Sequence, residues 1–317
     1  MSLWASTLAG FVPGLAVGVI LQRSHFCTMG SISDAVLFGS FRRLRVWALA
    51  LATALVGTWL LDALALVDLS ASSYRQEGWL FAGALPGGIL FGFGMVQAGG
   101  CVSRNLVRLG SGSLKALVTL LVLATAAIAT AALLPSPVTS IAHQGTALLP
   151  VAASGGLLLL CLRHPGFRRS REDLATGLLL GAVIPLGWLA TSLAAVRPDS
   201  VNYLALDRLG LVLPLAAGTV LGALATALWR GEFRVERFAA TGDLRRHLVG
   251  GLLMGVGGVL AMGCTLGQGL TGASTLSPGS LLALAGMLVG GWWGVKCLET
   301  GRLLPLRRRR QLAQVGE

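Results

Sequence analysis

Three cysteines lie at or near the start of short segments rich in glycine and hydroxyl residues, although the rest of the chain is strongly apolar. A thiol offers a weak S–H donor and a soft, polarizable sulfur that can contact another sulfur atom. A small sulfur-containing anion matches both properties. The segments are "SHFCTMGSISDAVLF" (24–38), "CVSRNLVRLGSG" (101–112) and "CTLGQGLTGASTLSPG" (264–279), and their cysteines are Cys27, Cys101 and Cys264.

Each of these segments is too short to cross a bilayer, which takes about 20 helical residues. We expect half-helices or re-entrant loops that dip into the membrane, where broken backbone is tolerated only beside protein or a water-lined cavity. A helix N-terminus carries unsatisfied N–H groups and about half a positive charge. Cys101 and Cys264 lie at such starts. The segments therefore predict a pathway that favours an anion.

Neutral side chains and glycines near the cysteines complete the predicted substrate site. Hydroxyl and amide groups supply hydrogen bonds, and glycines allow the backbone to approach the substrate closely. The residues besides the cysteines are Gly100, Ser103, Asn105, Gly263, Thr265 and Gln268. Because no lysine or arginine lies in the middle of a predicted span, we expect weak binding by dipoles and neutral donors, which suits transport.

The other cysteines and two nearby arginines have simpler interpretations. Cys161 and Cys297 fall within or at the ends of ordinary spans and are predicted to be packing residues. Arg104 and Arg108 are interpreted first as topology charges or as side chains that snorkel to lipid head groups. The alternative is that these arginines draw anions toward the inner mouth of the pathway.

Composition places the chain in the membrane. Of 317 residues, 54% are hydrophobic and only 12% are charged, and the mean hydropathy is +0.76. We expect one membrane transport domain over 1–317 without a cleaved signal peptide, since no basic region precedes the first apolar run. The net charge of +12 comes from short loops beside apolar spans, so it indicates membrane topology and no nucleic-acid partner. No C-x-x-C pair occurs, and we expect no metal or other cofactor.

The predicted fold is an all-α integral membrane protein with about nine transmembrane helices. Basic residues gather in alternate loops, including "RRRR" at 307–310, whereas the opposite loops carry only Arg75 and Arg197. The positive-inside rule then places the N-terminus outside and the C-terminus in the cytoplasm of a multi-pass protein of the inner, or plasma, membrane. The nine predicted spans are 3–22, 46–67, 79–98, 113–134, 146–162, 174–196, 205–229, 248–263 and 278–299.

An internal repeat relates the two halves of the chain. A shift of 163 residues aligns "GGILFGFGMVQAGGC" (87–101) with "GGLLMGVGGVLAMGC" (250–264), which share nine of fifteen residues. The predicted repeats cover about 3–134 and 166–299. Because the single span 146–162 joins them, the second half is expected to be inverted, as in many transporters.

The repeat also predicts a second copy of the first short segment. Residues 186–196 correspond to that segment, with Ala190 in place of the cysteine. Pro185 lies just before them and is expected to interrupt the sixth span.

At the cysteine motifs the chain resembles the YeeE/YedE family of sulfur-compound transporters. The resemblance rests on "LQRSHFCTMGSISD" (21–34), "GGCVSRNLVRLGSGS" (99–113) and "MGCTLGQGLTGAS" (262–274), and with the span count it covers nearly the whole chain. It implies an inverted repeat whose re-entrant half-helices surround a central path, and three cysteines that handle the substrate in turn. Relatives often have a small residue where Arg104 stands, so the substrate itself stays open among thiosulfate and related sulfur or selenium compounds.

The resemblance predicts a permease for thiosulfate or a related small sulfur anion, and not an enzyme. It also implies a small cytoplasmic sulfur-carrier protein as a partner. Two other functions stay open on the residues alone. Three thiols could transport a soft cation such as copper(I), and two of them could exchange electrons as a thiol-disulfide oxidoreductase if they came close together. Within transport, a persulfide relay is the alternative to passage of the intact anion.

Overall fold

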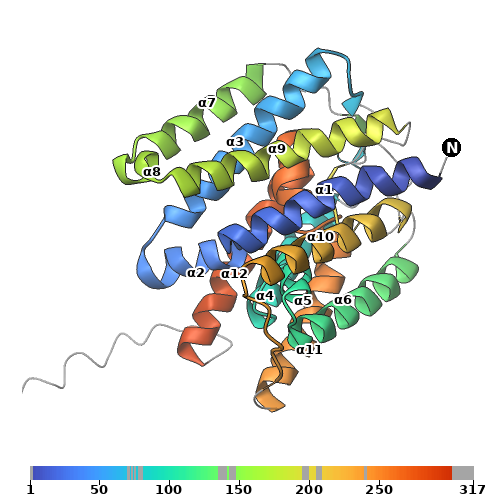
Figure 1. Ribbon diagram of the computed structural model, residues 1–317, viewed down its shortest axis with the longest axis vertical. Coiled ribbons are helices and arrows are strands. Elements are labelled where there is room, and N and C mark those ends of the chain that lie inside the picture. Colours follow the sequence, from blue (N-terminus) through green and yellow to red (C-terminus); the bar gives the residue numbers. More distant parts are fainter. Residues whose placement is uncertain are drawn as a thin grey trace, which may run out of the picture.

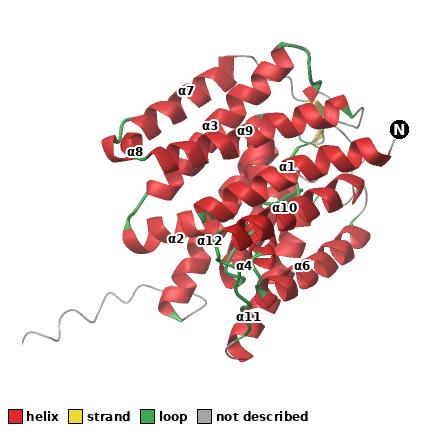
Figure 2. Cartoon of the chain, viewed as in Figure 1, coloured by secondary structure: helices red, strands yellow, loops and turns green. Residues whose placement is uncertain are grey.

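The computed structural model is a bundle of helices, with one pair of two-residue strands near the end where the chain begins (Figures 1 and 2). It describes residues 3–69, 72, 74, 76–77, 81–134, 141–142, 148–194, 200–204, 209–238 and 241–301. Arg75, Arg197 and "RRRR" at 307–310, which were used to predict the topology, lie outside these residues. The elements are α1 (Leu3–Ser24), α2 (Thr28–Phe38), α3 (Arg42–Ala63), β1 (Gln76–Glu77), α4 (Phe81–Gln97), α5 (Val102–Gly110), α6 (Leu114–Leu133), β2 (Ile141–Ala142), α7 (Leu148–Leu162), α8 (Pro165–Arg169), α9 (Arg171–Leu193), α10 (Leu209–Trp229), α11 (Thr241–Leu260), the π-helix η3 (Gly267–Gly272) and α12 (Pro278–Thr300).

The described chain contains seven helical stretches long and apolar enough to cross a membrane, which confirms an all-α, multi-pass membrane protein. Two of the seven are runs that include a break beside a cysteine, Trp4–Phe38 and Ala82–Gly110. The other five lie on α3, α6, α9, α10 and α12.

Two of the nine predicted spans are not among the helices long and apolar enough to cross a membrane. The span 146–162 corresponds to α7, whose apolar described part is Ala152–Leu162. The span 248–263 corresponds to the second part of α11, which begins with the polar sequence "TGDLRRH". All nine predicted spans coincide with helices, but the count of nine crossings stays a prediction.

The helices pack in matching pairs. Helix α1 lies along α10 and α3 lies along α9, while α4 lies along α12 and α6 lies along α11. Under the 163-residue shift, α1 corresponds to α9, α3 to α10, α4 to α11 and α6 to α12, so each of these pairs has its counterpart in the other half. In Figure 1, α3, α7 and α9 form one side of the bundle, and α1 and α10 cross its middle. This pairing agrees with the internal repeat.

Glycines make these helix pairs unusually close. On α4, a Cβ at Gly88 or Gly92 would collide with the backbone carbonyls of Ala283 and Met287 on α12. On α12, Gly290 faces the carbonyl of Ile89 in the same way. In membranes, small residues allow the direct contact of helix backbones that drives association, because lipid removes the hydrophobic force between helices.

One sequence-based expectation about the helices is wrong. We expected Pro185 to interrupt the sixth span, but α9 runs through it from Arg171 to Leu193. The ring of Pro185 lies against Gly57 of α3, where a Cβ would come within 2.6 Å of the proline Cγ. Since neighbouring helices in a membrane protein can accommodate a proline, the residue shapes a packing contact and does not end the helix.

The α4–α12 contact gives a test of the packing. Gly92→Val places a branched side chain against backbone atoms of α12, and such overpacking costs about 1–3 kcal/mol. We therefore expect a lower thermal unfolding midpoint for the purified protein in detergent. The matched control is Gly156→Val on α7, where a Cβ meets no atom within 4 Å. Equal midpoints for the two variants would contradict the packing described here.

Candidate functional site

Cys101 follows a break between two helices. Helix α4 ends at Gln97, and Gly99 adopts a φ of +69°, a left-handed conformation that glycine takes without strain. Cys101 is then the N-cap residue of α5 and is only 2% exposed. The hydroxyl of Ser103 lies 3.2 Å from its sulfur. The sequence "GGC" thus ends one helix and presents a buried thiol at the start of the next.

Cys27 follows a second helix break, between α1 and α2, and lies beside Cys101. Helix α1 ends at Ser24, His25 has a φ of +49°, and Cys27 is the extended N-cap residue of α2. Its thiol lies beside the Cys101 thiol, within range of electrostatic interaction. The structure therefore brings together two sulfhydryl groups that are 74 positions apart in the sequence.

Cys264 heads the third segment, which contains the π-helix η3. Met262 has a φ of +57° and ends the turn after α11, and Cys264 is fully buried. The backbone N–H of Gly267 donates a hydrogen bond of 3.3 Å to its sulfur. The next residue, Thr265, places its hydroxyl near the Cys101 thiol. The third segment therefore joins the thiol pair through Thr265.

The three cysteines share a local geometry. In each case the backbone N–H three residues further on lies close to the cysteine sulfur, and these amides belong to Gly30, Arg104 and Gly267. Each sulfur therefore lies at a backbone terminus with unsatisfied N–H groups, where partial positive charge collects. Such a terminus attracts negative charge.

Several buried polar atoms beside Cys101 have no hydrogen-bond partner among the described residues. They are the Thr265 hydroxyl oxygen, the Asn105 side-chain oxygen and Nη1 of Arg104. An unsatisfied buried polar group costs about 1–3 kcal/mol, so a cluster of them indicates a place for water or a ligand. The unpaired hydroxyl, amide oxygen and guanidinium nitrogen therefore surround the thiol pair.

Not every predicted site residue is free to bind substrate. The Asn105 amide donates to the carbonyls of Gly100 at 2.9 Å and Cys101 at 3.1 Å, so it stabilises the turn while its oxygen stays unpaired. Gln268 accepts a hydrogen bond from the Ser280 hydroxyl. These contacts hold the segments in place.

Gly263 is also engaged in packing, and it points to a part of the site that the sequence did not reveal. A Cβ there would come within 3.2 Å of the Asn202 side chain. Asn202 donates to the Met262 carbonyl at 3.3 Å, and its neighbour Tyr203 lies within electrostatic range of Cys101 and Cys264. Tyr203 is one of only two tyrosines in the chain, and this scarcity in "SVNYL" was the only available signal.

A cavity of about 330 Å³ lies next to this cluster. Arg104 lines it and also lies within electrostatic range of Cys27, so this side chain connects the cavity to the thiol pair. Further lining residues are Gln22, His25, Arg108, Ser111, Ser113, Glu232, Arg234 and Glu236. The cavity therefore lies between α5 and the loop that joins α10 to α11.

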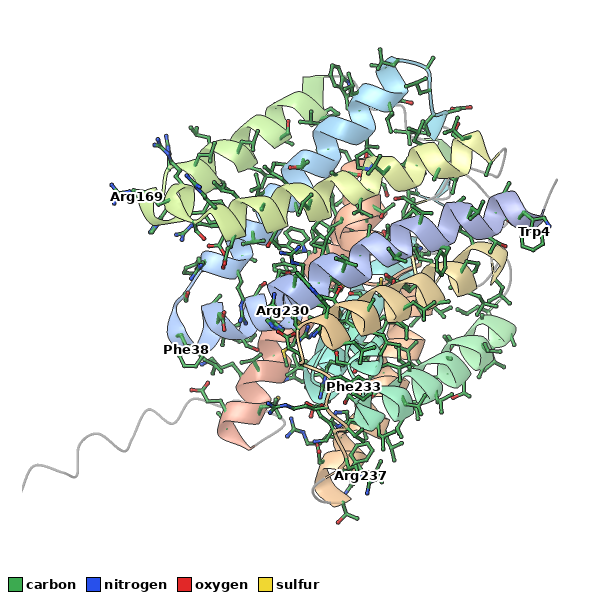
Figure 3. All side chains as sticks on the ribbon, in the orientation of Figure 1. Trp4, Phe38, Arg169, Arg230, Phe233 and Arg237 are labelled. Atoms are coloured by element: carbon green, nitrogen blue, oxygen red, sulfur yellow. The ribbon has the colours of Figure 1, made fainter. Side chains whose placement is uncertain are left out.

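The loop between α10 and α11 covers this cavity and is tied to the turn after α5. Arg234 N–H donates to Ser111 O at 3.0 Å, and Leu114 N–H donates to Glu236 O at 3.0 Å. Figure 3 shows the loop running downward from Arg230 at the end of α10, past Phe233, to Arg237. These bonds hold the loop in a fixed position at the opening of the cavity.

Side-chain bonds reinforce this attachment. Arg108 donates to the Glu236 carboxylate at 3.0 Å and the Ser113 hydroxyl donates to it at 2.9 Å. The hydrogen bond from Arg108, followed by that from Ser113, holds the pKa of Glu236 below its usual value despite partial burial. The ion pair between Arg108 and Glu236 is therefore fully formed at neutral pH.

The cysteines are free thiols, and the described residues contain no group of three or more histidine, cysteine, aspartate and glutamate side chains that could hold a metal ion. A copper site would need several such ligands around one point. Here the surroundings of the thiol pair are a hydroxyl, an amide oxygen, a guanidinium and backbone N–H groups. This set favours an anion.

Comparison with known proteins agrees with that chemistry. The sequence model of a family described as "Sulphur transport" matches residues 23–163 and 146–293, which together span most of the chain. The chain belongs to the sulphur transport family. Membership places it among transporters and not among enzymes, as the motifs predicted. The family model matches the chain twice, once over each half, in agreement with the internal repeat.

Two relatives from distant bacteria are similar to this member of the sulphur transport family. Both are named thiosulfate transporter TsuA, and both are 24% identical over 321 residues. The protein from Escherichia coli strain K12 matches 84% of this chain and 88% of its own length. The protein from Spirochaeta thermophila matches 86% of this chain and 92% of its own length. The resemblance therefore covers nearly the whole of each chain.

The contact between two thiols can be tested by oxidation. Cys27 and Cys101 lie side by side as free thiols, so mild oxidation of the purified protein should join them in a disulfide. Peptide mass spectrometry should detect this linked pair, and Cys101→Ala should abolish it. Cys161 and Cys297 serve as internal controls and should stay reduced. Failure to form the Cys27–Cys101 link would show that the two sulfurs do not meet.

The loop attachment predicts a second result. Glu236→Gln removes the charge that Arg108 contacts, so the amides of Arg234 and Leu114 should exchange hydrogen about twofold to fivefold faster, because partly exposed ion pairs contribute under about 1 kcal/mol. Glu299→Gln on α12 is the control, since it leaves the loop unchanged.

The pH dependence follows from the lowered pKa of Glu236. The ion pair is fully formed above the usual glutamate pKa and is lost as the pH falls through the lowered value. Loop amides should therefore lose protection at low pH in the unchanged protein, after correction for the intrinsic exchange rate. A loop that stays equally protected at low pH, or in the Gln variant, would contradict this account.

Proposed function

We propose that this protein is a permease for thiosulfate or a related small sulfur-containing anion. The observation that carries the proposal is the meeting of Cys27 and Cys101 beside the unpaired hydroxyl of Thr265 in a chain of the sulphur transport family. Relatives named as thiosulfate transporters, aligned over most of their length, support this substrate class.

The site suits a divalent sulfur anion that must both bind and leave. Neutral S–H and O–H groups donate hydrogen bonds to oxygen or sulfur atoms, and helix N-termini supply partial positive charge without a strong ion pair. The thiols add a soft contact for the outer sulfur atom of thiosulfate. Moderate affinity at each of several contacts allows release as well as entry.

In this proposal the three segments line one central path, and Cys27, Cys101 and Cys264 meet the anion along it. Ser103 and Thr265 supply further hydrogen bonds, with Cys101 between them. The remaining predicted residues, Gly100, Asn105, Gly263 and Gln268, hold the segments in position around the path.

The membrane arrangement is part of the same proposal. The helix pairing and the double family match support two inverted repeats, about 3–134 and 166–299, linked by the span at 146–162. The distribution of basic residues supports an N-terminus outside and a C-terminus in the cytoplasm of the inner membrane. The cavity beside Arg104 then opens to the cytoplasm, where a sulfur-carrier protein would receive the substrate.

Two other functions make different demands on the thiols. A copper permease needs bound metal that disappears with the cysteines, which metal analysis measures directly. A thiol-disulfide oxidoreductase needs Cys27 and Cys101 to cycle between thiol and disulfide during turnover; their proximity is the observation that favours it. Detection of a persulfide on a cysteine after substrate exposure would indicate a sulfur relay in place of passage of the intact anion.

Uptake by cells that lack other thiosulfate transporters tests the proposal. Cys101→Ala removes a donor at the centre of the site, and loss of a hydrogen bond to a charged group costs about 1.5–3 kcal/mol. We expect radiolabelled thiosulfate uptake to fall about tenfold or more, because each 1.4 kcal/mol is a factor of ten. Cys264→Ala should also reduce uptake.

The controls are Cys297→Ala and Cys161→Ala, which alter buried thiols away from the site and should preserve uptake at equal protein level. Unchanged uptake in both Cys101→Ala and Cys264→Ala would rule out the proposed role of the cysteines. Absence of uptake by the unchanged protein would rule out thiosulfate as its substrate.

A further inference from the structure

We propose that the cavity beside the thiol pair is a second anion site, in which the Arg104 guanidinium binds the sulfur anion between the thiols and the loop that joins α10 to α11. The inference rests on the proposed function and adds a charged staging site to it. The site recognises a divalent tetrahedral oxyanion by its charge and its oxygen atoms. It does not require the outer sulfur atom.

The position of Arg104 supports this assignment. The residue lies in the first turn of α5, and its stem folds back over the preceding turn, where a Cβ at Gly100 would come within 2.9 Å of the arginine Cγ. From there the side chain lines the cavity and lies within electrostatic range of Cys27. One guanidinium therefore faces both the cavity and the thiol pair.

One nitrogen of the Arg104 guanidinium is buried without a partner in the part of the chain that the structure describes. Its Nη1 atom is shielded from solvent and has no hydrogen-bond partner among the described residues. A buried N–H of a guanidinium needs an acceptor, since an unsatisfied charged donor costs more than a neutral one. Its planar fork of N–H groups fits two oxygen atoms of one anion.

The two carboxylates that line the cavity are already paired. Arg108 contacts Glu236 at 3.0 Å, and the Glu232 carboxylate accepts hydrogen bonds from Gln22 at 2.9 Å and Arg230 at 2.8 Å. His25 lies 3.8 Å from the same carboxylate. The two glutamates are thus held by partners other than Arg104, and they leave its charge uncompensated.

The size of the cavity allows an anion to enter with water. Its volume of about 330 Å³ compares with about 30 Å³ for one water molecule in the liquid. An anion that leaves the drier thiol pair can regain part of its hydration shell there while Arg104 holds it. The two sites then recognise different features of the anion. The cavity recognises its charge and oxygen atoms, and the thiols recognise its sulfur atom.

Sulfate separates the two sites because it has the charge of thiosulfate without the outer sulfur atom. Equilibrium binding of radiolabelled sulfate to the purified protein in detergent measures the cavity without regard to membrane orientation. We expect Arg104→Gln to raise the Kd for sulfate at least tenfold and Arg104→Lys to raise it severalfold, since lysine keeps the charge but loses the fork.

The matched control is Arg169→Gln, which removes one positive charge at the far edge of the molecule from this loop (Figure 3) and should leave the Kd unchanged. If Arg104→Gln does not fold, Arg104→Lys decides the question. An unchanged Kd in the folded Arg104 variant, or no sulfate binding by the unchanged protein, would overturn the inference.

Uptake distinguishes this failure from failure of the proposed function. Thiosulfate uptake that depends on Cys101 but is indifferent to Arg104, together with unaltered sulfate binding in Arg104→Gln, removes the second site and leaves the permease. Sulfate binding that depends on Arg104 in a protein without thiosulfate uptake leaves the anion site and removes the proposed substrate.

Discussion

The structure depends on the rule that a backbone polar group removed from water must find a partner inside the protein. Two helical runs break beside a cysteine, at His25 and at Gly99, and a third segment widens into a π-helix. Such breaks are possible at membrane depth only because neighbouring helices surround them. The exposed N–H groups at each break are the source of the positive potential that the thiols share.

Close helix packing provides those surroundings. Glycines bring α1 against α10 and α4 against α12 at distances that no larger residue permits, and the short segments lie against these pairs. The same residues explain why the chain has 44 glycines. Many of them serve the approach of helices, and only a few, such as Gly99, are required by a left-handed backbone conformation.

Much of this arrangement was predictable because its signals are local. Apolar runs gave the helices, and the "GGC" and "MGC" motifs gave the breaks at Cys101 and Cys264. The contacts between distant residues were not predictable in the same way. The three cysteine segments were expected to share one path, but no pattern indicated that Asn202 would pack on Gly263 or that Gln268 would accept a hydrogen bond from Ser280. Pro185 misled because its effect depends on Gly57 of another helix.

The π-helix has a consequence for how the third segment can move. Its residues follow a wider turn than an α-helix, and the Leu266 carbonyl accepts from both Leu270 at 3.1 Å and Thr271 at 2.9 Å. This shared acceptor means that the turn holds one residue more than a regular helix needs. The extra residue can shift along the segment when one N–H group replaces the other at a shared carbonyl. Such a shift rotates the side chains after Cys264 while the two flanking helices stay in place.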